Sequence, residues 1–261
     1  EYEVKTYQGQ FAFYDEQEMK DPMIVDTGLA HSADTMTNTF TEKAIAEMDK
    51  ATLEVKPAEW GFDAVVDAIA KMNIENEEGL FLFYSPNTFE GERIGTYIVV
   101  QKMADPYTPI GEPVPVVKAS IDEEIFCRNR YKDGQHWHTI EGAYWFQEGE
   151  WQYLMYSGGR YEDETYFVGY AAAKTTEQDL TKVKFQKMPD DSTYAPLLRS
   201  NDWEEGTGHN SVIKEDGQYY IVYHARNTEA DGLNGDRRNA RIAKMHVENG
   251  KIWVERYPDH I

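Results

Sequence analysis

The segment EGEWQYLMYSGG (148–159) carries the pattern that decides the fold. A glycine that favours a tight turn precedes a run of aromatic and aliphatic residues, which ends in a tyrosine and small residues. Three other segments share this pattern, namely YQGQFAFYDE (7–16), EEGLFLFYSPN (77–87) and EDGQYYIVYHAR (215–226). Each of them predicts a β-strand entered from a turn.

The pattern recurs at a nearly constant period. Its tyrosines stand at positions 14, 84, 156 and 223, with spacings of 70, 72 and 67 residues. A further strand is expected after each of them, at 27–34, 94–103, 166–174 and 240–247. Several strands per unit at a fixed period are typical of β-propeller blades. A β-sandwich would also supply short strands, but not this self-similarity.

We therefore predict an all-β chain that forms a single β-propeller domain over residues 1–261. Four blades are expected, at about 1–58, 59–118, 138–197 and 198–261.

Composition limits the classes of partner. The formal net charge is −21, with 47 acidic against 26 basic residues, which argues against nucleic acid or an anionic membrane and suits a neutral substrate. No apolar run approaches the ~18 residues of a membrane span, and the single cysteine, Cys127, allows no internal disulfide. No stretch resembles a signal peptide, so we expect a cytoplasmic protein, with secretion after removal of a leader as the alternative.

The stretch DGQHWHTIEGAYWF (133–146) places one carboxylate, Glu141, among aromatic and imidazole rings. Burial disfavours the charged form of a carboxyl group and so raises its pKa, which is how an acid stays protonated near neutral pH. The alternative is a Glu141 that pairs with a nearby Arg or Lys, because structural ion pairs are also common at such positions.

The first strand of each propeller blade lines the central channel. The repeat places four polar residues on these strands, Glu3, Asp63, Glu141 and His209. The segment around Asp63 also has helical spacing, so the expected strand there is limited to residues 63–66. Three carboxylates and an imidazole in one pocket suit the protonation of a leaving group and the activation of a water molecule.

Longer segments resemble a known family. TIEGAYWFQEGEWQYLMYSGG (139–159) followed by YFVGYAAAKT (166–175) resembles the acid-bearing blade of glycoside hydrolase family 43. GTGHNSVIKEDGQYYIVYHAR (206–226) resembles its final blade, and WGFDAVVDA (60–68) resembles the blade that carries its pKa-modulating Asp. Members are five-bladed propellers that hydrolyse arabinofuranosides, xylosides and related plant glycans with inversion. The resemblance therefore implies an enzyme for neutral arabino- or xylo-oligosaccharides.

The resemblance also implies residue roles. Glu141 would be the general acid, and Asp63 would orient it and raise its pKa. His209 would lie on the propeller axis, where the family often holds a calcium or other ion, and no organic cofactor is implied. Glu3 corresponds to a residue that contacts substrate.

Five further residues are candidates for substrate contacts. Trp60, Phe62 and Trp137 are candidates for stacking on sugar faces, with a core position as the alternative. His138 is interpreted as pocket wall. Arg226 would hydrogen-bond a sugar hydroxyl or pair with a carboxylate.

The chain departs from the family at the general base. It resembles the family from the second blade onward, so the blade that carries the base has no counterpart. Asp15, Asp21 and Asp26 lie near the start without occupying a channel position, and the base stays unassigned. A lost blade would leave an exposed edge that favours pairing with another molecule. The missing base motivates one alternative, a catalytically impaired propeller that is a fragment or a module binding glycans or a partner. A second alternative is a retaining fructosidase-like relative, because that group shares the propeller.

Overall fold

The computed structural model describes residues 74–131, 134–228 and 238–256 in full, and the backbone of three earlier strands. The chain divides into two compact units, one of residues 1–74 with 104–108 and the other of residues 75–103 with 109–261. The blade boundaries given above stay predictions. The strands expected at 27–34 and 63–66 lie outside the described residues.

The first unit contains an antiparallel sheet in the order β1-β2-β3. Its strands are β1 (Tyr2–Tyr7), β2 (Gln10–Asp15) and β3 (Met23–Asp26). Glu3 of β1 lies opposite Tyr14 of β2 in the register. The first repeat tyrosine is thus on the middle strand of its sheet, and Glu3 is on the first strand, as the repeat predicts.

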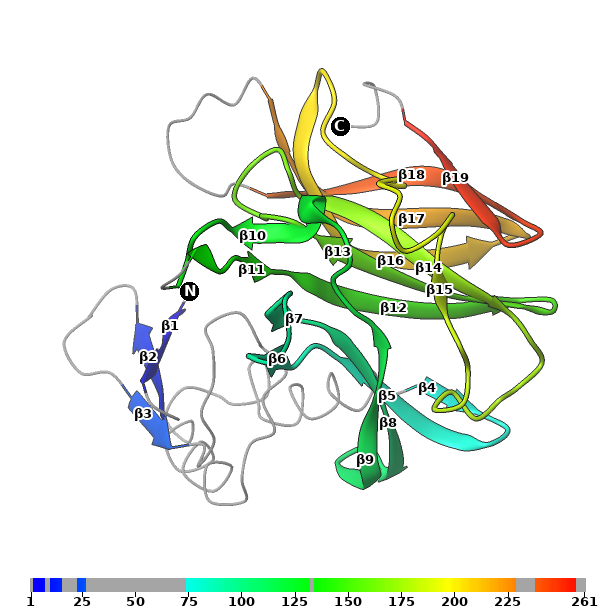
Figure 1. Cartoon of the computed structure of the whole chain (residues 1–261), viewed down its shortest axis with the longest axis horizontal. Coiled ribbons are helices and arrows are strands. Elements are labelled where there is room, and N and C mark those ends of the chain that lie inside the picture. The colour runs from blue at the N-terminus through cyan, green and yellow to red at the C-terminus, as the bar shows by residue number, and fades with distance from the viewer. Residues whose placement is uncertain are drawn as a thin grey trace. The chain divides into compact units, whose positions relative to one another are not determined.

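The second unit contains the other repeats, apart from Ile74 and residues 104–108 (Figure 1). Three four-stranded sheets have the orders β4-β5-β8-β9, β12-β13-β14-β15 and β16-β17-β18-β19. Their strands are β4 (Ile74–Asn76), β5 (Gly79–Tyr84), β8 (Ile98–Asp105), β9 (Thr108–Val117), β12 (Ile140–Glu148), β13 (Trp151–Gly158), β14 (Phe167–Lys174), β15 (Gln186–Lys187), β16 (Glu204–Glu215), β17 (Gln218–Asn227), β18 (Asn239–Glu248) and β19 (Lys251–Glu255). Tyr84, Tyr156 and Tyr223 lie on the second strand of their sheets, so the predicted strands are confirmed. Among the described residues, no helix is long and apolar enough to cross a bilayer.

Turn residues set the register of the hairpins. Glu215 of β16 pairs with Gln218 of β17, so the loop is Asp216-Gly217, and both residues have positive φ. The β18–β19 hairpin repeats this arrangement with Asn249-Gly250. Positive φ at both loop positions defines the type I′ turn, whose twist matches that of the strands. Local sequence therefore determines which residues of these strands face each other.

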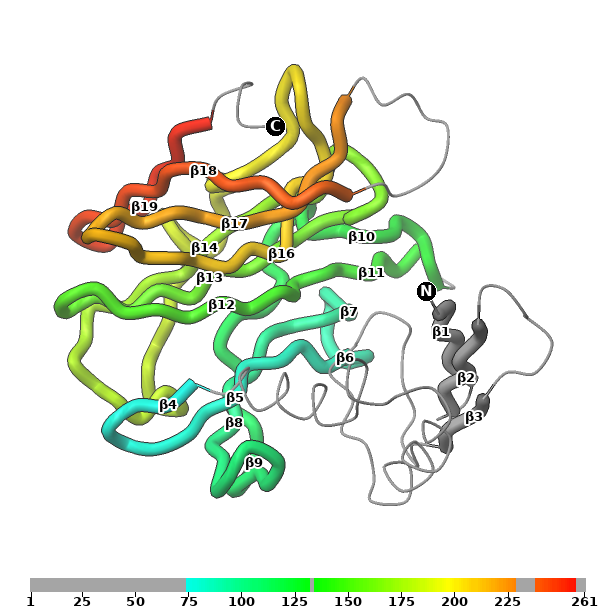
Figure 2. The backbone as a smooth tube through the Cα atoms, turned by 180° about the vertical axis from the view of Figure 1, so that it is seen from behind, coloured from blue at the N-terminus to red at the C-terminus, as the bar shows by residue number. Residues whose placement is uncertain are grey.

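The core of this unit lies between the β12–β15 and β16–β19 sheets, which run side by side (Figures 1 and 2). One cluster joins Tyr153, Met155 and Val168 of the first sheet to Ile221 and Met245 of the second, each at most 1% exposed. Full burial of an aliphatic side chain stabilises a fold by about 1.5–3 kcal/mol. The core thus fixes the first strands of two sheets, β12 and β16, against each other.

A fourth sheet in this unit is built from short strands that the repeat does not predict. Its order is β10-β11-β7-β6. The strands are β6 (Asn87–Thr88), β7 (Gly95–Thr96), β10 (Ile125–Cys127) and β11 (Trp137–His138), and a 3₁₀ turn, η1 (Asp122–Glu124), precedes β10. Gly95 has a φ of 143°, and a Cβ there would lie 1.8 Å from the His138 carbonyl oxygen. The strand expected at 94–103 is therefore divided between β7 and β8, because its start pairs with β11.

Candidate active site

Glu141 lies near the start of β12, where the pairing is irregular. It is opposite Ser157 of β13, and the register shifts between Glu141 and Tyr144. Gly142 has a φ of 63°, a conformation that glycine adopts without steric cost. A β-bulge of this kind changes the direction of a side chain relative to the sheet. The Glu141 side chain is partly exposed, so its carboxylate is accessible to a ligand.

Among the described residues, the Glu141 carboxylate has a hydrogen-bond donor but no ion-pair partner. The Tyr166 hydroxyl donates to its Oε1 over 2.8 Å. Within residues 74–131, 134–228 and 238–256, no Arg, Lys or His forms an ion pair with Glu141. The alternative of an Arg or Lys partner therefore has no support in the described part of the chain.

Tyr166 connects Glu141 to His209. The hydroxyl lies 2.6 Å from Nδ1 of His209, and the His209 backbone N–H donates to Oγ of Ser157 over 2.8 Å. The Tyr166 side chain is fully buried. Burial raises its pKa well above the usual value, the neighbouring Glu141 charge and hydrogen bond raise it further, and a hydrogen bond with Ser157 opposes them. Tyr166 is therefore a neutral phenol between two accessible groups.

Two glycines allow the rings to approach the backbone. A Cβ on Gly142 would lie 3.2 Å from Cδ2 of His209, and a Cβ on Gly208 would lie 1.8 Å from Cε1 of Tyr166. His209 itself has a φ of 45° and lies within the second register shift of β16, between Gly208 and Ser211. His209 is exposed, so this second bulge presents its ring to solvent.

A second imidazole completes a stack of rings. The His224 ring lies 5.8 Å from the Tyr166 ring at an interplanar angle of 13° and 6.0 Å from the His209 ring at 21°. His224, Tyr166 and Ser157 are not among the site residues predicted from the sequence. The partners of Tyr166 lie 25 and 43 positions away, so no local spacing identifies them.

Trp137 is mostly enclosed by its neighbours. It is 7% exposed, and its ring lies 5.4 Å from Phe89 and 6.1 Å from Tyr131. The Arg130 guanidinium is 5.0 Å from the ring centroid. Only a small part of the indole is accessible to a sugar.

His138 is 3% exposed, and both of its ring nitrogens have partners. Arg93 Nη1 lies 2.9 Å from Nε2, and the Ile94 carbonyl oxygen lies 3.2 Å from Nδ1. Because a guanidinium only donates, Nε2 accepts and Nδ1 carries the proton. Burial, followed by the Arg93 charge, lowers the pKa of His138. His138 therefore acts as a neutral part of the wall.

Arg226 is 7% exposed and bonded within the protein. Its Nε lies 3.3 Å from Glu205 Oε1, and its Nη1 donates to the Tyr161 carbonyl oxygen over 2.6 Å. Of the two roles expected from sequence, these contacts match the carboxylate pairing.

The remaining predicted site residues are not placed. Asp63, Trp60 and Phe62 lie outside the described residues, and Glu3 is described only as part of the β1 backbone. The structure therefore brings together Glu141 and His209 of the predicted set.

His209 is the residue on which the expected ion depends. Its Nδ1 is engaged by Tyr166, so Nε2 is the nitrogen left for a ligand. Calcium prefers six to eight oxygen ligands, and one imidazole does not fit that preference without water. No group of three metal-binding side chains occurs among the residues with described side chains, so the calcium ion stays a prediction.

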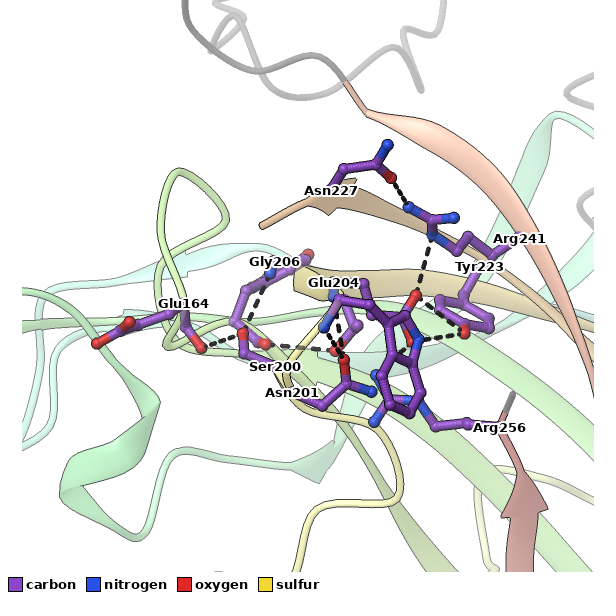
Figure 3. Close-up of polar contacts among 12 residues, drawn as sticks. Glu164, Ser200, Asn201, Glu204, Gly206, Tyr223, Asn227, Arg241 and Arg256 are labelled. Atoms are coloured by element: carbon purple, nitrogen blue, oxygen red, sulfur yellow. Dashed lines mark hydrogen bonds and ion pairs between the residues drawn. The ribbon is translucent and has the colours of Figure 1, made fainter. Parts of the chain in front are cut away.

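Two other enclosed carboxylates contrast with Glu141. Glu204 is 1% exposed and pairs with Arg241 and Arg256, while the Tyr223 hydroxyl donates to it over 3.0 Å (Figure 3). Glu124, which is fully buried, pairs with Lys187. Each of these carboxylates is balanced by a cation.

A cavity of about 480 Å³ lies beside this site rather than over it. Its lining is Asp122, Glu123, Ile125, Arg128, Glu164, Thr165, Tyr194, Arg199 and Ser200. It includes neither Glu141 nor His209, so we do not assign it to the chemistry of Glu141.

Comparison with known proteins identifies the family. The model of glycosyl hydrolases family 43 matches residues 18–252. The chain belongs to glycosyl hydrolase family 43. The family expected from the sequence is thereby confirmed.

A curated family 43 relative is the β-D-galactofuranosidase xynD of Aspergillus niger, which is 32% identical over 69% of this chain and 60% of its own length. The chain thus spans about 60% of the length of that relative.

Solved family 43 structures confirm the propeller fold. A thermostable family 43 glycoside hydrolase superposes with a TM-score of 0.56 at 20% identity, covering 98% of this chain and 74% of the other. The α-L-arabinofuranosidase of Lactobacillus brevis gives 0.55 at 19% identity, covering 96% and 74%. Together with the described sheets, these likenesses confirm an all-β chain of the five-bladed family 43 propeller type.

Proposed function

We propose that this family 43 chain is a glycoside hydrolase that cleaves arabino- or xylo-oligosaccharides by inverting single displacement, with Glu141 as the general acid. The observation that carries the proposal is the accessible Glu141 carboxylate, which accepts a hydrogen bond from Tyr166 and has no cation partner in the described structure.

The hydrogen bond from Tyr166 fixes the position of the Glu141 carboxyl group. Tyr166 is a neutral phenol, so it holds this group without adding a charge. We propose that Glu141, held in this way, gives its proton to the departing glycosidic oxygen.

Inversion needs two further groups. We propose that Asp63 orients Glu141 and keeps it protonated, as the family resemblance implies. A second carboxylate must activate water on the opposite face of the sugar, ~6.5–9.5 Å from the acid. The base is unassigned, and Glu3, Asp15, Asp21 and Asp26 are the residues to test.

A galactofuranoside is a second candidate substrate. The Aspergillus niger relative is named for galactofuranose, and galactofuranose shares its five-membered ring with arabinofuranose. A site that selects the furanose ring would accept both sugars and reject xylopyranose.

The first experiment measures nitrophenol release from aryl arabinofuranoside, xyloside and galactofuranoside, and sugar release from arabino- and xylo-oligosaccharides. The Glu141→Gln variant should lose about 10²–10⁴-fold on oligosaccharides, and less on aryl substrates, whose leaving groups need little protonation. Glu150→Gln, at an exposed turn of the same hairpin, is the matched control and should keep full activity.

Three outcomes separate the proposed function from its rivals. A folded chain that binds oligosaccharide but cleaves nothing is an impaired, glycan-binding propeller. A first product that retains the anomeric configuration, seen by proton NMR, indicates the retaining fructosidase-like alternative. Equal activity of Glu141→Gln and Glu150→Gln would exclude Glu141 as the acid.

A further inference from the structure

We propose that the cavity of about 480 Å³ beside the site is a second sugar-binding pocket, which holds remote units of a neutral oligosaccharide whose reacting bond lies at Glu141. Its volume is within the ~300–1,000 Å³ of typical ligand sites. The inference rests on the proposed function for the identity of the ligand. The shape and the chemistry of the cavity come from residues that the proposed function does not use.

The cavity adjoins the candidate site through the chain itself. One wall includes Thr165, the residue directly before Tyr166, whose hydroxyl donates to Glu141. A second wall includes Ile125 of β10, which lies opposite His138 of β11 in the register. His138 stands three residues before Glu141, and three residues of extended chain span roughly 10 Å. This proximity is what allows one oligosaccharide to occupy both places.

The walls of the cavity are held in place before any ligand binds. The Ser200 hydroxyl donates to the Glu164 carbonyl oxygen over 2.7 Å and accepts from the backbone N–H of Gly206 in β16 over 3.4 Å (Figure 3). Thr165 is fixed by Asp163, whose Oδ1 accepts from the Thr165 backbone N–H over 2.8 Å. A pocket that is formed in advance loses less binding free energy to the ordering of its own side chains.

The polar lining contains both hydrogen-bond donors and acceptors. Arg128 and Arg199 contribute guanidinium groups, which only donate, while Glu123 and Glu164 contribute carboxylates, which only accept when ionised. All four residues are exposed, and neither arginine forms an ion pair with a residue whose side chain the structure describes. A sugar hydroxyl donates and accepts, so it can use both kinds of group.

The charges of the lining favour a neutral ligand. Asp122, a third carboxylate, is already paired with Arg93 over 2.9 Å, which leaves two carboxylates and two guanidinium groups in the cavity. These charges cancel. The formal net charge of the chain is −21, so its long-range field repels an anion.

Two apolar side chains complete the lining. Ile125 is 7% exposed, and Tyr194 is partly buried, with its ring 5.1 Å from the Phe167 ring at an interplanar angle of 85°. Apolar and aromatic surface beside a few polar groups is typical of small-molecule pockets. A sugar presents C–H groups on the faces of its ring as well as hydroxyls, so the cavity matches both of its surfaces.

A remote sugar pocket has a specific kinetic signature. Units held there contribute binding free energy far from the reacting bond, so they act on long substrates and not on aryl glycosides with one sugar. The value of kcat/KM should therefore rise with chain length until the cavity is filled, and removal of a cavity residue should cancel that rise. Neither Glu141 nor His209 lines the cavity, so the reaction on short substrates should change little.

The first measurement is calorimetric titration with arabino- and xylo-oligosaccharides of increasing length, using the full chain with Glu141→Gln to slow cleavage. We expect binding to tighten with each added unit until the cavity is filled. Arg199→Ala and Arg128→Ala, each added to this chain, should weaken binding of the long oligosaccharides about tenfold, the scale of one hydrogen bond to a charged group. Equal Kd values for the long oligosaccharides with and without the arginine substitutions would overturn the proposal.

Lys174→Ala is the matched control for the arginine variants. It also removes one exposed cation, but Lys174 ends β14 and pairs with Glu150 of the β12–β13 turn, outside the cavity lining. Its binding of every oligosaccharide should equal that of the parent chain. A tenfold loss in Lys174→Ala as well would show that the arginines act through the overall charge, and would refute the pocket.

The second measurement is kinetic and uses the same substitutions in the active chain. In Arg199→Ala and Arg128→Ala, kcat/KM on long oligosaccharides should fall about tenfold, with a much smaller change on aryl glycosides. Equal losses on aryl glycosides and on long oligosaccharides would show that the arginines support the reacting bond or the fold, and would refute a remote pocket.

An oligosaccharide that carries a uronic acid tests the charge of the ligand. It should bind no more tightly than the neutral oligosaccharide of the same length. Tighter binding that is lost in Arg199→Ala would assign the cavity to an anionic sugar and overturn the proposal of a neutral one.

These measurements separate the failure of this inference from that of the proposed function. A wild-type chain that cleaves no glycoside, but whose oligosaccharide binding is weakened by the arginine substitutions, refutes the proposed function and supports the pocket. An active enzyme whose preference for chain length is the same with and without these substitutions refutes the pocket and leaves the function intact.

Discussion

Glu141 and Glu204 lie at the starts of neighbouring first strands, β12 and β16, and each accepts a hydrogen bond from a buried tyrosine. Their other partners differ. Glu204 is 1% exposed and is paired with two guanidinium groups, whereas Glu141 is partly exposed and has no cation in the described structure. A glutamate–tyrosine pair therefore has two different settings in this molecule: an accessible one at Glu141 and a buried, ion-paired one at Glu204.

The contrast between the two glutamates shows that a tyrosine–carboxylate pair does not by itself indicate chemistry. Arg241 and Arg256 both pair with the buried Glu204, so this carboxylate stabilises the last sheet through ion pairs. Glu141 has no such ion-pair partner among the described residues, and its side chain is partly exposed. The electrostatic surroundings, rather than the hydrogen bond, distinguish a candidate acid from a structural residue.

The largest effect on stability should follow Glu204→Gln. Removing one partner of a buried ion pair leaves uncompensated charge and costs about 3–5 kcal/mol. The free energy of unfolding, measured by denaturant titration, should fall by that amount. Glu141→Gln is the matched variant and should change it by less than about 0.5 kcal/mol. Equal losses in the two variants would remove the distinction between the two glutamates.

A smaller loss should follow Gly142→Ala. A non-glycine residue in the left-handed region costs about 1–2 kcal/mol, and the new Cβ would also press on the His209 ring. Gly149→Ala measures the backbone strain alone. Gly149 also has a positive φ, of 58°, but no atom lies within 4 Å of the place that its new methyl group would occupy. Denaturation should show similar losses, and only Gly142→Ala should reduce kcat. A reduced kcat in both variants would contradict this assignment.

The smallest expected effect is that of His138 on the pH dependence of stability. His138 is a buried imidazole beside a cation, so it can be compared with the buried carboxylate Glu204. Its pKa is lowered by burial and by Arg93, against the opposing effects of Ile94, Glu124 and Asp122. The unfolded chain takes up a proton here near pH ~6.5, whereas the folded chain does so only at lower pH. The folded state therefore loses stability as the pH falls through that range.

His138→Asn should remove this loss, so its free energy of unfolding should depend less on pH below about 6.5 than that of the wild type. Denaturant titrations at several pH values test this. Parallel pH profiles for the two proteins would show that His138 titrates in the same way in the folded and unfolded chains.

The repeat tyrosines predicted the second strands because each strand lies inside a sheet. In β13, residues 152–158 are all buried, and the apolar run at 153–156 within this stretch can be recognised from the local sequence. The type I′ hairpins were equally readable, since Asp-Gly and Asn-Gly favour positive φ. The β10-β11-β7-β6 sheet was missed because strands of two or three residues contain no periodicity.

At the candidate site, Glu141 and His209 could be predicted because they occupy the same place in successive repeats. Tyr166 could not: the strand predicted at 166–174 begins one residue later, at Phe167, so Tyr166 lies just before it. Its role depends on where the hydroxyl points, which is fixed by packing across two sheets. Arg226 illustrates the same limit. Whether it pairs with a carboxylate or binds a sugar hydroxyl depends on how close Glu205 lies to it in the fold, which the sequence does not show.

The two hydrogen bonds of Tyr166 also bear on the order in which the site forms during folding. Its bond to Glu141 closes a loop of 25 residues within one sheet, whereas its bond to His209 spans 43 residues and needs the next sheet in place. Long-range contacts form only after the entropy cost of loop closure has been met. A chain folded as far as β15 thus contains the acid and its tyrosine, but the site is completed only when the last sheet docks.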